Sequence, residues 1–110
     1  FYIDKEDELQ TLKGSRHSIG YKKSDANFQF KEHVIKVQEG MKFYVTTDGY
    51  IDQNGGEKGF PYGKRKFGEL IINNKAQDFS NQKEVLLNAL AEYQGDEARN
   101  DDVTVVGFKI

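Results

Sequence analysis

Apolar and polar positions alternate in short runs through the first half of the chain, which is the pattern of β-strands. Residues 1–4 and 8–12 form two expected strands with a turn between them. A longer strand is expected over 28–37, and residues 41–47 form the next one after a tight turn at 39–40. The last two strands together are expected to make a β-hairpin.

The second half of the chain has the periodicity of helices. A short helix is expected over 67–72, and a longer one over 82–94, where apolar residues recur at spacings of three and four. Asn81 is the expected N-cap of the longer helix, and Gly95 its C-terminal stop. The apolar face of this helix carries Val85, Leu86, Ala89, Leu90 and Tyr93. A strongly apolar strand over 103–110, expected to be buried on both faces, completes the pattern.

Strands followed by helices indicate an α+β fold, with helices packed on one face of an antiparallel sheet. The 110 residues suit a single domain, or part of one, that is large enough to bury a core. The sequence starts at Phe1 inside what reads as a strand, and it has no initiator Met. We therefore expect residues 1–110 to be a partial domain, cut from a longer protein.

The composition excludes several classes of protein. The net charge is only −2, with 16 basic and 18 acidic residues, which argues against a dedicated partner of nucleic acid or of a membrane surface. The absence of cysteine excludes disulfides and cysteine-based zinc sites, and it fits a reducing compartment. No apolar run approaches the roughly 20 residues of a membrane span. We therefore expect a cytoplasmic segment that contacts neither nucleic acid nor membrane, although a full-length protein could be tethered to a membrane elsewhere.

Two groups of acidic residues stand where a loop meets an apolar strand. Asp48 follows the strand over 41–47, and Asp101 and Asp102 precede the strand over 103–110. If these strands are antiparallel neighbours, the carboxylates converge at one edge of the sheet. Converging carboxylates repel one another unless a proton or a cation lies between them, and oxygen ligands favour Mg²⁺, Mn²⁺ or Ca²⁺ over zinc. The pattern is thus compatible with a metal site.

Other interpretations of these residues stay open at this point. Aspartate is common in turns because its side chain bonds to nearby backbone groups, so the three aspartates could simply make turns. The glycine-rich stretch 52–63 lacks the ligand spacing of an EF-hand. The basic run 64–66 could bind phosphate, but short basic runs are more often solvated surface.

Three pieces of the chain, taken together, resemble one family. They read FYVTTDGYID over 43–52, FG over 67–68 and NDDVTVV over 100–106. In this order and spacing they resemble the C-terminal half of metal-dependent, protein phosphatase 2C-like (PPM) serine/threonine phosphatases. The bacterial branch typified by stage II sporulation protein E is the most similar. The resemblance extends over nearly the whole chain.

The resemblance implies a site and a reaction. Asp48 and Asp101 match the positions that bind two Mn²⁺ or Mg²⁺ ions in the family, with Asp102 as a supporting residue and Gly49 at the turn. The ions activate a water that attacks phosphoserine or phosphothreonine on a regulatory protein, such as an anti-sigma-factor antagonist. The residues that bind this phosphoprotein substrate are not indicated. The implied fold is a four-layer αββα sandwich, of which this chain is one part.

One family feature has no match in the chain. The N-terminal half of these phosphatases supplies an aspartate that bridges both metals, and no segment here resembles it. We therefore expect the 110-residue chain alone to bind metal weakly, to have little or no phosphatase activity, and to form a homodimer through an exposed sheet face. Two alternatives are a non-catalytic, phosphatase-like interaction module in signalling, and a small α+β domain without a site.

Overall fold

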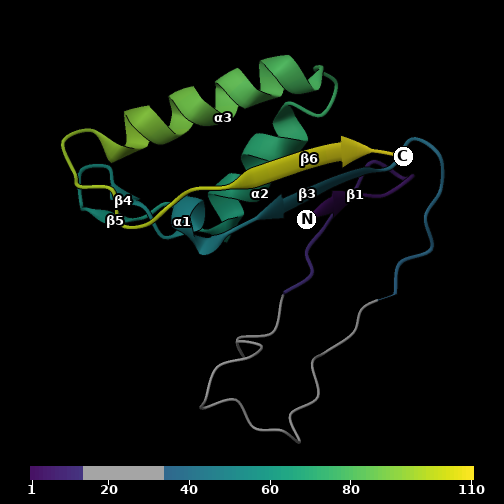
Figure 1. The fold of residues 1–110 in the computed structure, drawn as a ribbon, viewed down its shortest axis with the longest axis horizontal. Helices are drawn as coiled ribbons and strands as arrows, with labels where there is room; N and C mark the ends of the chain where they lie inside the picture. Colours follow the sequence, from purple (N-terminus) through teal and green to yellow (C-terminus); the bar gives the residue numbers. More distant parts are fainter. Residues whose placement is uncertain (14–33) are drawn as a thin grey trace, which may run out of the picture.

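The structure, a computed structural model, describes residues 1–13 and 34–110 and has an α+β arrangement (Figure 1). A four-stranded antiparallel sheet has the strand order β2-β1-β3-β6. Its strands are β1 (Tyr2–Ile3), β2 (Leu9–Gln10), β3 (Lys42–Thr46) and β6 (Val105–Lys109). The helices are α1 (Asp48–Ile51), α2 (Lys64–Asn73) and α3 (Phe79–Gln94), and a separate small hairpin consists of β4 (Asn54–Gly55) and β5 (Phe60–Pro61).

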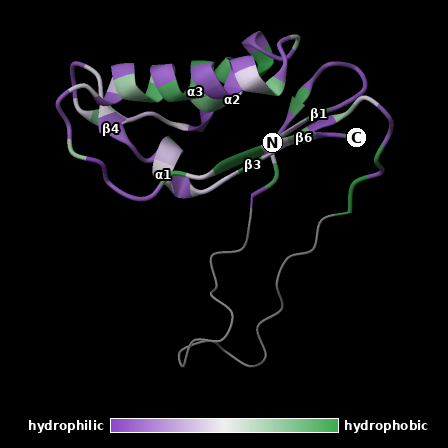
Figure 2. Ribbon diagram, turned by 45° about the horizontal axis from the view of Figure 1, so that its top comes forward, coloured by the Kyte–Doolittle hydropathy of each residue, from purple (hydrophilic) through white to green (hydrophobic). Residues whose placement is uncertain are grey.

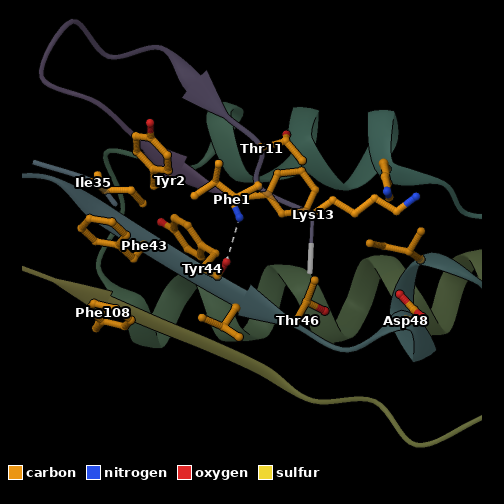
Figure 3. A pocket seen from close by; sticks show the side chains of 14 residues that line it. Phe1, Tyr2, Thr11, Lys13, Ile35, Phe43, Tyr44, Thr46, Asp48 and Phe108 are labelled. Carbon is orange, nitrogen blue, oxygen red and sulfur yellow. Dashed lines mark hydrogen bonds between the residues drawn. The ribbon is translucent and has the colours of Figure 1, made fainter. Parts of the chain in front are cut away.

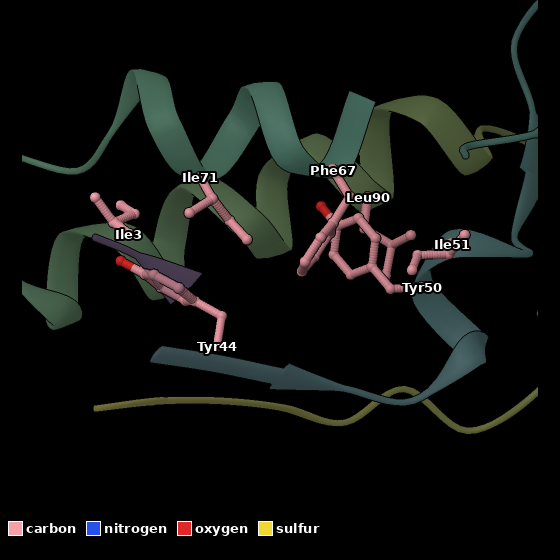
Figure 4. Packing of buried hydrophobic residues seen from close by; sticks show 7 residues of the cluster. All are labelled: Ile3, Tyr44, Tyr50, Ile51, Phe67, Ile71 and Leu90. Carbon is pink, nitrogen blue, oxygen red and sulfur yellow. The ribbon is translucent and has the colours of Figure 1, made fainter. Parts of the chain in front are cut away.

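The core lies between the sheet and the two longer helices (Figure 4). Helices α2 and α3 both lie over one face of the sheet, as the sequence pattern predicts. The buried apolar side chains are Ile3, Tyr44, Tyr50, Ile51, Phe67, Ile71 and Leu90. The hydroxyl groups of two core tyrosines are satisfied: that of Tyr44 donates to Gln82 Oε1 at 2.7 Å, and that of Tyr50 donates to the Leu86 carbonyl at 2.7 Å. Burial raises the pKa of both hydroxyl groups.

The central strand β3 is paired along both edges. Tyr2 of β1 is the register partner of Phe43, and β6 pairs with all five residues of β3, from Lys42↔Lys109 to Thr46↔Val105. The antiparallel neighbours that the sequence analysis required are therefore present. As a result, the C-terminal end of β3 and the N-terminal start of β6 lie at the same edge of the sheet.

The expected hairpin over 28–47 is wrong in its first strand, as far as the structure describes it. Residues 34–37 form no strand, Val34 is 95% exposed, and residues 28–33 lie outside the described part. The reason is that β1 and β6 already take both hydrogen-bonding edges of β3. The tight turn is present, and Gly40 adopts φ +93°, a conformation that suits glycine.

Both expected helices are present, with different starts. Helix α2 begins at Lys64, three residues before the expected start, and α3 begins at Phe79. The N-cap of α3 is Asp78 rather than Asn81, because Asp78 Oδ1 accepts a hydrogen bond from the Asn81 backbone N–H at 2.8 Å. The helix ends at Gly95, as expected, and its predicted apolar face is turned toward the core.

The face of the sheet opposite the helices, called here the outer face, is partly open to solvent. Phe43 stacks on Tyr2 with ring centroids 5.6 Å apart and on Phe108 at 5.2 Å. These rings lie in a row in Figure 3. The expectation that the last strand is buried on both faces is wrong, since Val106 and Phe108 are 51% and 42% exposed. In the hydropathy view of Figure 2, helices α2 and α3 lie on the other side of the sheet.

Candidate functional site

Asp48 is held on a firmly anchored piece of backbone. It is the first residue of α1 and follows directly on β3 and Thr47, the N-cap residue. The two residues at the end of α1, Tyr50 and Ile51, are buried in the core, whereas Asp48 itself is exposed. The local sequence explains this, because polar residues end the strand and the apolar pair that follows turns the short helix inward. The Asp48 carboxylate is therefore accessible on a rigid support.

Asp101 and Asp102 lie in a segment that crosses from α3 to β6. Residues 98–104 have neither helix nor strand, and both aspartates are exposed. Asp101 Oδ1 accepts a hydrogen bond from the Asp102 backbone N–H at 2.7 Å. This bond is to the adjacent backbone, and the alternative that Asp101 only makes a turn stays a prediction.

Hydrogen bonds of Thr47 join the two acidic segments. The Thr47 N–H donates to the Thr104 carbonyl at 3.1 Å, and the Thr104 N–H donates to Thr47 Oγ1 at 3.2 Å. Thr47 Oγ1 also donates to the Asp102 carbonyl at 3.4 Å. The structure thus brings the backbone that carries Asp48 against the backbone that carries Asp101 and Asp102. Their role as metal ligands stays a prediction.

Gly49 is required by close packing rather than by a sharp turn. It has a helical conformation and is absent from the described residues with positive φ. A Cβ atom at this position would lie 2.0 Å from the Asp102 carbonyl oxygen and 2.8 Å from its carbon. The expected role of Gly49 at the turn is therefore corrected: it lets α1 approach the Asp102 backbone.

The described residues can supply only part of a metal-binding set. In the ranges 1–13 and 34–110, no group of three or more His, Cys, Asp or Glu side chains is placed to hold a metal ion. The carboxylate oxygens of Asp48 and Asp101 are nevertheless the ligand type that Mg²⁺ and Mn²⁺ take in proteins. The residues present thus fit such ions in donor type, and a complete site needs further ligands.

A cavity of about 400 Å³ runs along the outer face beside Asp48 (Figure 3). At one end the cavity is lined by the stacked aromatic rings of Tyr2, Phe43 and Phe108. Its other end is polar, with Thr46, Asp48 and Lys64. Asp48 therefore borders both the Asp102 segment and the outer face.

The basic run over 64–66 begins α2, and two of its side chains are engaged with neighbours. Arg65 forms an ion pair with Glu69 at 3.0 Å along the helix. The Lys66 ammonium lies 4.5 Å from the centre of the Tyr93 ring. These contacts favour a structural role over phosphate binding.

Gln53 is a site residue that the sequence pattern did not reveal. It lies at the start of a glycine-rich stretch, yet its side chain is completely buried. Its amide contacts the segment that leads to Asp101: Nε2 donates to the Ala98 carbonyl at 2.9 Å, and Oε1 accepts from the Asn100 N–H at 3.3 Å. A polar residue in a glycine-rich stretch carries no periodicity that signals burial, so no local pattern could have identified it.

The chain belongs to the stage II sporulation protein E (SpoIIE) family, whose family model matches residues 1–110. This confirms the resemblance carried by the three motifs, which is to PPM-type phosphatases. The match spans the whole chain and includes both acidic segments.

Among solved structures, the chain is similar to the SiaA-PP2C domain of Pseudomonas aeruginosa. The TM-score is 0.79 and the sequence identity 36%, over 94% of this chain and 39% of that chain. The match confirms that the sheet with helices on one face is part of a PP2C-like fold. The chain thus spans about two fifths of the length of that structure. A comparison with curated proteins found no match. In the described part of the chain, no helix has the length and apolar character needed to cross a bilayer.

Proposed function

We propose that this chain is the C-terminal, metal-ligating part of a bacterial protein serine/threonine phosphatase. Its substrate class is phosphoserine or phosphothreonine on a regulatory protein, such as an anti-sigma-factor antagonist. The main support is that β3, which leads to Asp48, pairs with β6, which follows Asp101, within a chain of the SpoIIE family. The SiaA-PP2C likeness supports the same class of enzyme.

In this proposal, Asp48 and Asp101 hold Mn²⁺ or Mg²⁺ ions and take no part in proton transfer. Bound divalent ions supply an activated water for attack on phosphorus and offset the charge of the phosphoryl oxygens. Asp102 supports the site through its backbone, whose carbonyl packs on Gly49 and accepts from Thr47. Residues 46–49 and 101–104 therefore act as one rigid unit that presents two carboxylates to the cations.

The chain alone is expected to have weak metal affinity and little or no phosphatase activity. Two aspartates offer too few ligands for a tight two-metal site, and in the described residues no group of three or more His, Cys, Asp or Glu side chains is placed to hold a metal ion. The remaining ligands would come from the parts of a PP2C-like domain that this chain does not match. Titration of residues 1–110 with Mn²⁺ by calorimetry tests this, and micromolar affinity or tighter would contradict it.

The proposal is tested with the full-length protein, p-nitrophenyl phosphate and Mn²⁺. Asp48→Asn and Asp101→Asn are each expected to abolish hydrolysis, since both remove a charged metal ligand. Asp52→Asn is the matched control: this exposed aspartate lies in the same region and its side chain has no assigned role, so activity is retained. Asp102→Asn is expected to leave most of the activity intact, because the backbone carbonyl that contacts Gly49 and Thr47 is unchanged by this substitution.

Two results would contradict the proposal. Activity that survives Asp48→Asn would remove the metal role of this carboxylate. A full-length protein that shows no Mn²⁺-dependent hydrolysis of any phosphoprotein or p-nitrophenyl phosphate would instead favour the alternative of a non-catalytic interaction module.

A further inference from the structure

The segment that carries Asp101 has no regular structure of its own. Residues 98–104 lie between the end of α3 and the start of β6. At its far end this segment is tied to Thr47 through the hydrogen bonds of Thr104 and Asp102 described above. These hydrogen bonds alone would leave residues 98–101 free to move. The position of Asp101 therefore depends on the contacts made by the start of the segment, at residues 98–100.

Gln53 makes the hydrogen bonds that hold the start of this segment, at residues 98–100. Its amide donates to the Ala98 carbonyl and accepts from the Asn100 N–H, so it is hydrogen-bonded to the residues on both sides of Arg99. The Asn100 side chain adds a parallel contact, with Nδ2 donating to the Asp52 carbonyl at 3.0 Å. Asp101 therefore lies between two attachment points, and both lead back to the backbone that flanks α1.

Gln53 is itself held rigidly. Its backbone N–H donates to the Tyr50 carbonyl at 3.3 Å, and its carbonyl accepts from the Tyr62 N–H at 2.9 Å. The neighbouring hairpin is fixed to the end of α3, where the Gly56 N–H donates to the Tyr93 carbonyl at 2.9 Å. The Gln53 amide is completely buried, so it has no water to replace a lost partner. Its hydrogen bonds to the segment are thus strongly favoured over any alternative.

We propose that Gln53 is a positioning residue that fixes Asp101 relative to Asp48. By tying the 98–100 segment to the end of α1, it sets the separation of the two carboxylates proposed to hold metal. The inference rests on the proposed function, because it concerns the same two aspartates. Groups that orient metal ligands from one step away typically change metal affinity by about 10–100-fold when removed.

The test compares Gln53→Met with Gln82→Met in the full-length protein. Methionine keeps the length and volume of the side chain but forms none of the amide hydrogen bonds. Gln82 is the matched control, because it is also buried and hydrogen-bonded, to Tyr44 and to the Gln77 carbonyl, but neither of these hydrogen bonds involves the 98–104 segment. Both variants lose stability, which thermal unfolding monitors.

Two readouts separate positioning from stability. Mn²⁺ affinity, measured by electron paramagnetic resonance of the free ion, is expected to fall about 10-fold or more in Gln53→Met and to stay unchanged in Gln82→Met. Hydrogen–deuterium exchange of a peptide spanning 96–104 is expected to accelerate only in Gln53→Met, because the Asn100 N–H loses its acceptor. If both readouts are the same in the two variants, the proposal is wrong.

Further variants keep the result interpretable. Should Gln53→Met fail to fold, Gln53→Asn replaces it, since asparagine keeps a buried amide but draws it back by one carbon atom from Ala98 and Asn100. Unchanged Mn²⁺ affinity in Gln53→Asn would then overturn the inference. Asp48→Asn is measured alongside: if it leaves Mn²⁺ affinity intact, the proposed function fails, whereas a loss there with no effect at Gln53 refutes only the positioning role.

Discussion

Gly49 on α1 packs directly against the carbonyl group of Asp102, although the two residues are far apart in the sequence. A Cβ atom on Gly49 would lie 2.0 Å from the Asp102 oxygen, a distance that no real side chain tolerates. The contact joins the residue after Asp48 to the residue after Asp101. At this point the two acidic segments are too close to admit a side chain between them.

Gly49→Ala is expected to destabilise the protein and weaken its metal affinity. The clash is with backbone atoms, which cannot rotate away, so α1 and the Asp102 segment must separate. Inserting a carbon atom into a packed contact costs about 1–3 kcal/mol. Thermal unfolding measures the first effect and Mn²⁺ titration of the full-length protein the second.

Gly68→Ala serves as the control for Gly49→Ala. Its added Cβ would meet Leu9 Cδ2 at 2.7 Å, which is the end of a flexible side chain, and alanine favours the helix by about 1 kcal/mol over glycine. It should therefore lose less stability than Gly49→Ala. If Gly68→Ala loses as much stability as Gly49→Ala, or more, the contact of Gly49 with Asp102 does not explain the effect of Gly49→Ala.

Asp78→Ala is expected to lower the free energy of unfolding by about 1 kcal/mol, whereas Asn81→Ala should have little effect. Asp78 caps α3 by accepting from the Asn81 backbone N–H, a contact that needs the Asp78 side chain but not that of Asn81. Urea unfolding followed by circular dichroism compares the variants. A larger effect for Asn81→Ala would contradict the observed cap.

Residues 1–110 alone are expected to dimerise through the outer face, with a second copy of the chain as the occupant. Val45 and Val106 are register partners on this face, 61% and 51% exposed, and they continue the aromatic row of Phe43 and Phe108. A contiguous apolar patch of this kind favours association. Sedimentation equilibrium measures it, and Val45→Lys should shift the chain to monomer.

Leu87→Lys is the control for this experiment, because Leu87 is 56% exposed on α3, away from the outer face. It should leave the dimer intact. A wild-type chain that is monomeric at all concentrations, or a dimer disrupted equally by both substitutions, would argue against the outer face as the interface.

Stability is expected to fall above about pH 10. Burial raises the pKa of Tyr44 and Tyr50 in the folded chain, so the folded state favours the neutral hydroxyl. Their contribution is full below the pKa of the unfolded state, near 10, and is lost as the pH rises through the folded-state pKa. Urea unfolding at a series of pH values measures this.

Tyr50→Phe measures how much Tyr50 contributes to the loss of folding stability at alkaline pH. At pH 8 it should cost about 1 kcal/mol, because the hydrogen bond to the Leu86 carbonyl is removed. Above pH 10 its stability should fall less steeply than that of the wild type, since one titrating group is gone. An identical slope would assign the alkaline loss to other groups.

Local pattern was sufficient for much of the fold. The apolar spacing of Leu86 and Leu90 predicted the buried face of α3, and Gly95 marked its end. The order of the TDG, FG and DDVT motifs was sufficient for the family, which the match over residues 1–110 confirms. Each of these signals lies within a few neighbouring residues, and that is why the sequence alone carries them.

The partner of β3, the cap of α3 and the role of Gln53 were decided only by the tertiary structure. The sequence favoured a hairpin with residues 28–37, but β1 and β6 take both edges of β3. Aspartate and asparagine are both good N-cap residues, and the structure shows Asp78 rather than Asn81 in this position. The meeting of Asp48 with the Asp101 segment depends on pairing between strands far apart in the chain, because long-range register is a property of the whole sheet rather than of any one segment.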